Sequence, residues 1–405
     1  MNQGSSERRS RIRLINPFNR ASVATTTLAA LGILSAMSVA ACSHSSLPGQ
    51  TAQTLSQQYK NCIGGTGGMS ASAQTARPLP VIGGCPSPPP QWDIIVANPG
   101  NNSATSYQFT TTGNATPLAT LTATTNKLSG DYGIWFDGDT GDFFISNATT
   151  NSVNRYNISC LNGGGPGSGC PDSILSGSLT GLNAPYGATE NYGLFLPQGD
   201  EPAYTIDTAT PAIVAQLENQ GGDATPLYTI KGTNTQLADG QGLAIDGTAS
   251  SPNYGAIYAD SVKAKQVMMW LPSSQFPTPA PNAILNVAPH KTIGGTNTGI
   301  TDPLGLYVDQ SGYLYVVNQG PDQVLVFAPS ASGNVAPVNK ITTSLSKPYG
   351  VSVYTDLTVW VTNDGDNSVR SYSNGHGPSS TLKSTIMGTN TGLNKPANLD
   401  VRISR

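Results

Sequence analysis

The chain has 405 residues, of which only 11% are charged, and its formal net charge is −3. Soluble proteins usually carry about 25% charged residues, so we expect a surface covered mainly by Thr, Ser, Asn and Gly. Beyond residue 41 no cluster of Lys and Arg could neutralise a row of phosphates, and nucleic acid is therefore excluded as an expected partner.

The first 41 residues are typical of an export signal rather than of a folded segment. Five arginines precede an uncharged, largely apolar stretch at residues 21–41, which is too rich in Ala, Ser and Thr for a membrane span. Without the first 41 residues, 15 basic and 22 acidic side chains remain, which gives a formal charge of −7. We therefore expect an acidic mature protein.

The signal ends in Val39-Ala40-Ala41-Cys42, which resembles the lipobox of bacterial lipoproteins. The resemblance implies cleavage before Cys42, acylation of that cysteine and a location in the bacterial cell envelope. Several acyl chains on one residue hold a protein firmly at a membrane, since each buried methylene contributes about 0.8 kcal/mol. By analogy, Ser43 after the cysteine favours the outer membrane. The alternative is an ordinary cleaved signal that leaves Cys42 as a free thiol.

Residues 42–91 have the composition of a tether. They are rich in Pro, Gly and Ser, show little apolar periodicity and include the proline-rich run at residues 86–90. Such a segment is expected to be flexible at first and stiffened by polyproline near its end. We expect it to hold a folded domain away from the membrane.

Four further cysteines fall into two local pairs. Cys160 and Cys170 flank a Gly-rich loop, and Cys62 and Cys85 flank a second flexible stretch. An even number of cysteines in an exported chain favours two disulfides, and local pairing is the expected one of the three connectivities. Metal binding is the alternative, although no CxxC pair and no nearby His supports it.

Residues 92–405 repeat a unit of short strands separated by Gly, Asn, Asp and Pro. Runs of about five β-branched, aromatic or other apolar residues between turn formers indicate strands rather than helices. A phrase of the type Thr-Ile-x-Gly-Thr-Asn-Thr recurs at residues 229–235, 292–298 and 385–391, which marks an internal repeat. First strands are predicted at residues 131–137, 185–189, 240–246, 303–309 and 348–353. Second strands are predicted at residues 143–147, 256–260, 314–318 and 359–363, and third strands at residues 323–327 and 368–372.

The two ends of this region complete each other. Residues 94–98 match the second strand of the repeat, but no first strand precedes them. Residues 396–401 match the first strand of the repeat, but no second strand follows them. Joining them makes one complete blade, which is how a β-propeller closes its ring and removes exposed sheet edges. The sequence therefore predicts an all-β, six-bladed β-propeller, closed by pairing of the C-terminal strand with the first blade.

The repeat of Pro-x-Gly, an apolar strand and Asp, followed by a strand that ends in Asn or Asp, resembles the NHL repeat. Residues 303–327 and 348–372 are the clearest copies, and the resemblance extends over about residues 92–405. Propellers of this kind include binding scaffolds, gluconolactonase-like hydrolases and streptogramin lyases. The fold alone therefore does not choose an activity.

In these families, chemistry is found at the mouth of the central channel, where loops lead into the innermost strands. The charged residues predicted there are Asp131, Asp239, Asp302, Lys347 and Lys395. The three aspartates could provide oxygen ligands for calcium or another divalent metal, although the two lysines would oppose a cation. The alternative interpretation is that each Asp caps the backbone of a local turn, in which case no cofactor is expected.

Aromatic residues recur at the same position of the repeat. Tyr132, Tyr186 and Tyr349 each stand just before a strand glycine and are candidate contacts for a sugar or another ring-bearing ligand. The alternative is that they only pack between blades. His290 and His376 are expected in surface loops, so a His-based acid or base is not predicted.

The sequence thus favours a cell-envelope lipoprotein whose propeller is a non-catalytic binding or scaffold module for a protein or glycan partner. Its contact with the membrane is expected through the lipid anchor only. The alternative is a metal-dependent lactonase or lyase built on Asp131, Asp239 and Asp302. A third possibility is a spacer that binds no small ligand.

Overall fold

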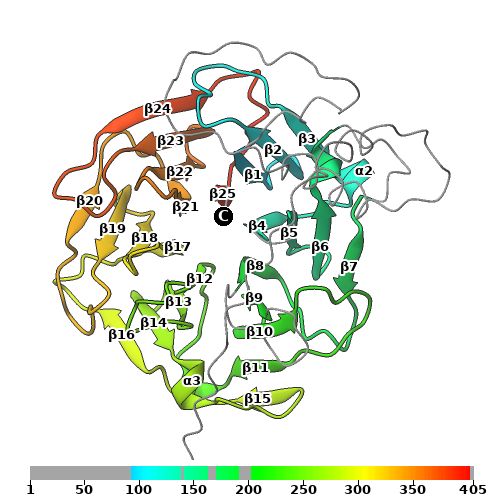
Figure 1. The fold of residues 1–405 in the computed structure, drawn as a ribbon, viewed down its shortest axis with the longest axis vertical. Coiled ribbons are helices and arrows are strands. Elements are labelled where there is room, and N and C mark those ends of the chain that lie inside the picture. Colours follow the sequence, from blue (N-terminus) through cyan, green and yellow to red (C-terminus); the bar gives the residue numbers. More distant parts are fainter. Residues whose placement is uncertain (1–92, 138–140, 163–169, 191–201, 402–405) are drawn as a thin grey trace, which may run out of the picture. The chain divides into compact units, whose positions relative to one another are not determined.

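The computed structural model describes residues 93–137, 141–162, 170–190 and 202–401. In this part of the chain, six small sheets are arranged around a central channel, and the only helices are single turns (Figure 1). The prediction of an all-β, six-bladed propeller is therefore confirmed. No helix among the described residues is long and apolar enough to span a bilayer.

The blades are numbered here in chain order, and their strands are given from the channel outward. Blade 1 contains β25 (Leu399–Val401), β1 (Ile94–Asn98), β2 (Ser103–Tyr107) and β3 (Ala119–Thr122), and blade 2 contains β4 (Asp131–Phe136), β5 (Asp142–Asn147), β6 (Ser152–Asn157) and β7 (Ser173–Ser176). Blade 3 contains β8 (Pro185–Glu190), β9 (Pro202–Asp207), β10 (Ala212–Leu217), β11 (Tyr228–Lys231) and β15 (Ala283–Leu285). Blade 4 contains β12 (Leu243–Ile245), β13 (Ile257–Ser261), β14 (Gln266–Trp270) and β16 (Lys291–Gly294), and blade 5 contains β17 (Pro303–Val308), β18 (Leu314–Asn318), β19 (Gln323–Phe327) and β20 (Asn339–Ile341). Blade 6 contains β21 (Pro348–Val353), β22 (Val359–Asn363), β23 (Ser368–Tyr372) and β24 (Leu382–Met387).

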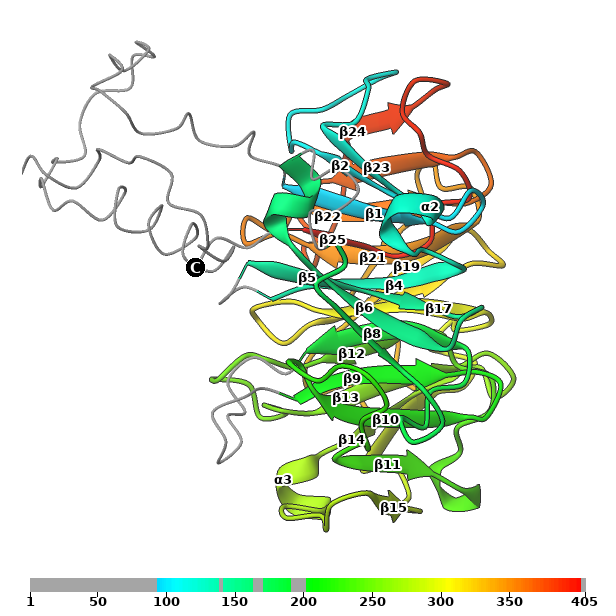
Figure 2. The same ribbon diagram turned by 90° about the vertical axis from the view of Figure 1, so that its right-hand side faces the viewer.

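The helical turns all lie in connections between strands. They are α2 (Ala123–Asn126), α3 (Pro272–Gln275) and two 3-10 segments, Ile158–Asn162 and Thr233–Thr235. Figures 1 and 2 both place α3 beside β15 at the rim of the propeller. The short β15 pairs in parallel with β11, so blade 3 has a fifth strand that the sequence pattern did not reveal.

Ring closure follows the predicted pairing. Strand β1 pairs antiparallel with β25, which matches Ile94 with Val401 and Val96 with Leu399. The first and last strands of the described chain thereby share one sheet, and the ring has no open seam.

The hydrophobic core consists of clusters between neighbouring blades. One such cluster joins Tyr258 and Met269 of blade 4 to Val316 and Leu325 of blade 5, and all four side chains are buried. Middle strands are buried on both faces because a blade covers each side, which explains their continuous apolar runs. Burial of this kind stabilises by about 25 cal/mol per Å² of apolar surface.

The recurring strand glycine has a steric cause. It occurs in four innermost strands, at Gly133, Gly187, Gly305 and Gly350, and directly before a fifth, at Gly242. A Cβ atom at each position would lie closer than 3.0 Å to a backbone carbonyl oxygen in, or up to two residues before, the next blade's innermost strand. Neighbouring innermost strands therefore approach too closely for any side chain, and only glycine fits at this position.

The recurring phrase ends the outer strand of a blade and fastens it to the next blade. In its three copies the last Thr hydroxyl donates to the Gly carbonyl oxygen at 2.7–2.8 Å. The Asn N–H of each copy donates at 2.7–2.8 Å to a side-chain oxygen of the following blade's connection, from Asn286, Asn334 or Asn114. Residues 177–180 form a fourth copy with a different sequence, in which Asp223 accepts from Leu179. The phrase therefore has a structural role.

One predicted disulfide is present, between Cys160 and Cys170, whose Cα atoms lie 5.8 Å apart. It fastens the connection between β6 and β7. The second predicted pair, Cys62 and Cys85, the signal at residues 1–41 with Cys42, and the tether at residues 42–91 lie outside the described residues.

Candidate functional site

Residues of the innermost strands β25, β4, β8, β12, β17 and β21 surround the channel. Its strand-start end is the end at which these strands begin, and its strand-exit end is the end at which they finish. The residues that the sequence singled out belong to the strand-start end. The structure brings some of these residues together, but it does not gather all of them at one site.

The three tyrosines come together in an aromatic layer that we define as Tyr132, Tyr186 and Tyr349. The ring of Tyr132 stacks on Tyr186 with centroids 4.2 Å apart and lies 6.0 Å from Tyr349. The Tyr349 hydroxyl donates to the side-chain oxygen Oε1 of Gln241 at 2.6 Å. Since Tyr349 belongs to blade 6 and its two contacts to blades 2 and 4, the layer crosses the channel.

Burial changes the ionisation of the aromatic layer. It raises the pKa of Tyr132 to about 12 and that of Tyr349 well above its ordinary value. Both phenols therefore stay protonated at neutral pH. Because the rings face one another, less ring surface is left for a sugar than the sequence interpretation assumed.

Asp131 lies beside this layer and is fully buried. Its Oδ2 accepts the backbone N–H of Asn98 at 3.0 Å, whereas its Oδ1 has no hydrogen-bond partner in the described structure. Burial raises the pKa of this carboxyl from 3.8 to about 7. The hydrogen bond joins blade 2 to blade 1, so Asp131 has a structural contact in addition to any role toward a ligand.

Asp239 and Asp302 are engaged in local turns. The Oδ1 atom of Asp239 accepts the backbone N–H of Lys263 at 3.0 Å and the hydroxyl of Ser261 at 3.3 Å. The backbone N–H of Asp302 donates to Asn318 at 2.8 Å. Within the described ranges, the only group of three potential ligands with atoms within 4.8 Å is Cys160, Cys170 and Asp172, and its cysteines form the disulfide. The three aspartates therefore do not converge on one metal position.

Lys347 and Lys395 occupy equivalent positions in the turns before β21 and β25. Both have left-handed backbone angles, with φ of 44° and 51°, and exposed side chains. Their N–H groups donate at 2.7 Å to Asp322 and Asn367 of the preceding blade. Their backbones thus hold neighbouring blades together, and their ammonium groups remain at the surface.

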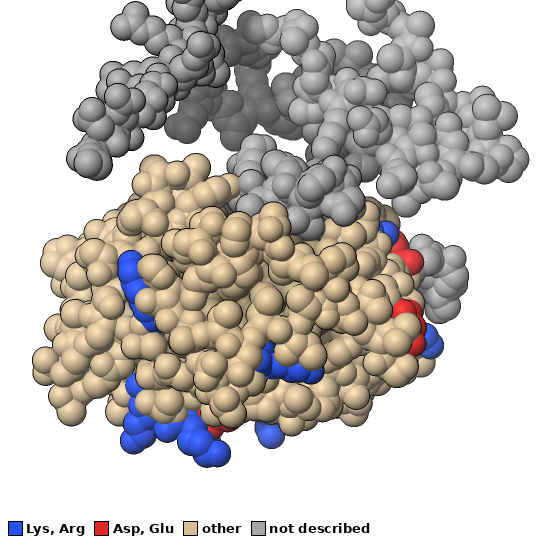
Figure 3. Space-filling view, turned by 90° about the horizontal axis from the view of Figure 1, so that it is seen from below, with Lys and Arg blue, Asp and Glu red and all other residues tan. Residues whose placement is uncertain are grey.

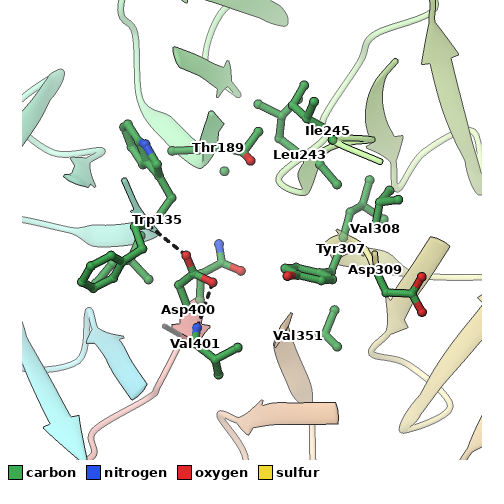
Figure 4. Close-up of a pocket in the computed structure, with 18 of the residues that line it drawn as sticks. Trp135, Thr189, Leu243, Ile245, Tyr307, Val308, Asp309, Val351, Asp400 and Val401 are labelled. Carbon is green, nitrogen blue, oxygen red and sulfur yellow. Dashed lines mark hydrogen bonds between the residues drawn. The ribbon is translucent and has the colours of Figure 1, made fainter. Parts of the chain in front are cut away.

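A cavity of about 400 Å³ occupies the strand-exit half of the channel. Its walls come from all six innermost strands, mainly their later residues, and from short segments that flank β12, β17 and β25. Figure 4 shows Thr189, Leu243, Ile245, Tyr307, Val351 and Asp400 around this space. Small-molecule sites are typically 300–1,000 Å³. This cavity lies in that range, and apolar and polar residues both line it.

Asp400 is the acidic group that faces the cavity from β25 (Figure 4). Its Oδ2 accepts the N–H of Phe136 at 2.9 Å, and its Oδ1 accepts the N–H of Val401 at 2.8 Å and the hydroxyl of Ser352 at 3.1 Å. Burial raises the pKa of this carboxyl to about 6. The carboxylate is thus fixed by three blades and mostly ionised at neutral pH.

Asp309 also lines the cavity, but its carboxyl group points away from it (Figure 4). Its Oδ2 accepts the Tyr315 hydroxyl at 2.9 Å and lies 2.9 Å from Nδ1 of His376. The His376 ring stacks on Tyr313 with centroids 4.1 Å apart. His376 is thus held between blades 5 and 6, a contact that its isolated position in the sequence did not indicate.

The cavity was not predicted from the sequence, because the residues singled out there belong to the turns before the innermost strands and the cavity lies toward the opposite end of these strands. A usable signal was present: Asp400 is a charged residue between Leu399 and Val401 in an otherwise apolar innermost strand. A charged side chain in such a strand needs buried hydrogen-bond partners or a ligand. The remaining wall residues are ordinary strand residues, and no local pattern distinguishes them.

Uncharged residues cover most of the described surface on the face shown in Figure 3. Lys and Arg side chains occur there singly or in small groups, as the low charge content predicted. The cavity is therefore the feature of the described structure on which a functional interpretation best rests.

No protein-family model and no curated protein matches this chain. Among solved structures, a nidogen/laminin complex matches with a TM-score of 0.52 and 15% identity, covering 78% of this chain and 100% of that chain. A protein of unknown function from Bacteroides caccae has a TM-score of 0.49 and 8% identity over 77% of this chain and 98% of that chain. Virginiamycin B lyase from Staphylococcus aureus has a TM-score of 0.43 and 13% identity over 66% of this chain and 73% of that chain. At 15% identity the match to the nidogen/laminin complex shows the fold alone. The resemblance to NHL repeats stays an interpretation of the sequence pattern.

Proposed function

We propose that this protein is an envelope-anchored binding module that takes a small ligand, or a small terminal group of a protein or glycan partner, in its central cavity. The observation that carries the proposal is the cavity of about 400 Å³, in which apolar side chains and polar groups of the innermost strands share the walls. Rigid strands preorganise such a site, so that little ordering entropy is lost on binding.

The rival interpretation, a metal-dependent lactonase or lyase, has weaker support. It requires Asp131, Asp239 and Asp302 to act together, but Asp239 caps a turn and the described aspartates do not converge. Binding requires only the cavity and its polar groups, which the fold supplies directly.

Filling the cavity should abolish binding. Thr189 faces the cavity (Figure 4), so Thr189→Phe should place a phenyl ring inside it. With the neutral fluorescent probe N-phenyl-1-naphthylamine, we expect one site per wild-type chain and an affinity at least about tenfold lower in the variant, because the ring occupies the probe's volume. Fluorescence titration measures both quantities.

Thr342→Phe is the matched control, because Thr342 is exposed and does not line the cavity. It should bind the probe as the wild type does. Equal affinities in Thr189→Phe and the wild type, with both proteins folded by circular dichroism, would place binding elsewhere and refute the proposal.

Anchoring through Cys42 is the second part of the proposed function. It is supported by the lipobox-like residues 39–42 and by the tether composition of residues 42–91. When the full chain is expressed in a bacterium, we expect it in the membrane fraction, with acyl mass on the peptide that begins at Cys42. Cys42→Ser should lose the acyl mass and Cys62→Ser should keep it, as mass spectrometry of the N-terminal peptide will show. An acylated Cys42→Ser protein, or an unmodified wild type, would contradict this assignment.

A further inference from the structure

The charge of the cavity wall has one sign. Among the described residues that line the cavity, Asp309 and Asp400 are acidic and none is Lys, Arg or His. Asp309 turns its carboxyl group toward His376 and Tyr315, outside the cavity. Asp400 is therefore the group that sets the charge inside this part of the site.

The three partners of Asp400 are neutral donors. They are the N–H groups of Phe136 and Val401 and the hydroxyl of Ser352, which together hold the carboxylate in place. A carboxylate offers about four acceptor positions, so at least one remains for a further donor. Among the described residues Oδ2 accepts one hydrogen bond, from Phe136, and is therefore the atom on which that position is available.

Several aliphatic side chains share the cavity with the carboxylate. Leu243, Ile245 and Val351 surround the space, and Tyr307 extends toward its centre from β17 (Figure 4). Apolar protein walls lower the local dielectric and so strengthen the attraction between a fixed charge and a charge of opposite sign. The carboxylate of Asp400 repels an anion. A purely apolar molecule has no hydrogen-bond donor to pair with this carboxylate.

We propose that the cavity selects a small organic cation, an amine with an apolar body, whose ammonium group pairs with Asp400 while its body lies against the aliphatic wall. This inference rests on the proposed function, because it assigns the ligand class of the same cavity. The ammonium group donates to Oδ2 of Asp400, and the apolar body displaces water from the wall. Hydrogen bonds to charged groups contribute about 1.5–3 kcal/mol, which corresponds to a preference of about tenfold or more over a neutral isostere.

The test uses three probes of nearly equal shape: 4-phenylbutylamine, 4-phenylbutan-1-ol and 4-phenylbutyrate. Isothermal titration of each into the purified full chain should show the amine binding at least about tenfold more tightly than the alcohol, and the carboxylate more weakly than either. In Asp400→Asn the preference for the amine should fall to about twofold or less. Asp356→Asn, which removes an exposed carboxylate that does not line the cavity, should keep the preference unchanged.

The wild-type comparison is decisive even if Asp400→Asn does not fold. Equal affinities of amine and alcohol in the wild-type chain, or tighter binding of 4-phenylbutyrate, would overturn the proposed ligand class while leaving a functional cavity. Absence of binding by all three probes would also overturn it. Failure of the proposed function has a different signature, namely undiminished binding of N-phenyl-1-naphthylamine in Thr189→Phe.

Discussion

Gly242→Ala is expected to destabilise the propeller by at least about 3 kcal/mol, the upper part of the range for overpacked cores. A Cβ atom at this position would overlap the carbonyl oxygen of Leu304 and meet the Leu306 side chain. The obstacle is the backbone of the neighbouring innermost strand, which cannot move aside as a flexible side chain does. The methyl group therefore separates blades 4 and 5 at the channel, where they approach most closely.

Urea denaturation followed by circular dichroism measures this loss. Native domains are stable by only about 5–15 kcal/mol, so the variant should have a clearly lower midpoint or accumulate as unfolded protein. Gly320→Ala is the matched control: its Cβ atom would lie 3.4 Å from Cβ of Asp302, an ordinary contact, and its stability should stay within about 0.5 kcal/mol of the wild type. A Gly242→Ala protein as stable as this control would show that the interblade spacing is looser than described.

Asp131→Asn is expected to stabilise the protein at pH 8, by up to about 4 kcal/mol. The pKa of the buried Asp131 is raised from 3.8 to about 7, so between these values the folded state holds a proton that the unfolded state has released. The free energy of unfolding therefore falls as pH rises through this window. Above pH 7 the full loss of stability caused by the buried, ionised carboxylate is present. Asn keeps an oxygen that accepts the Asn98 N–H but carries no charge.

The measurement is the urea midpoint of both proteins at pH 5 and pH 8. The wild type should be more stable at pH 5, because burial also raises the pKa of Asp400 to about 6 and that of Asp207 and Asp260 well above 3.8. Asp131→Asn should show a smaller difference between the two pH values. A wild type that gains stability toward pH 8 would contradict the assignment.

The two glycine-containing patterns were visible in the sequence, but their physical causes were not. The strand glycines and the phrase at residues 229–235 were visible as repeats, and their period predicted the number of blades. Their physical causes were not visible, because the carbonyl oxygen that excludes a Cβ from Gly242 and the Asn286 side chain that fastens the phrase belong to the next blade. A repeat in the sequence shows that a constraint exists, and the contact between repeats shows what the constraint is.

The candidate site was less predictable for the same reason. The three tyrosines were expected together, but stacking of Tyr132 on Tyr186 depends on the distance between two innermost strands rather than on local sequence. Asp239 could equally have been a ligand or a cap, and only the position of the Lys263 N–H decides that it caps a turn. The roles proposed for Tyr349, Lys347 and Lys395 toward a ligand stay predictions.

The sequence by itself determined the all-β class, the six blades, the closure of the ring by its two ends and the Cys160–Cys170 disulfide. These features follow from strand periodicity and from pairings that are local or terminal. Only the tertiary structure decided where the channel is occupied by side chains and where it is hollow. That outcome depends on the distances between six strands that are far apart in the chain, which place Asp400 at a cavity and the tyrosines in a layer.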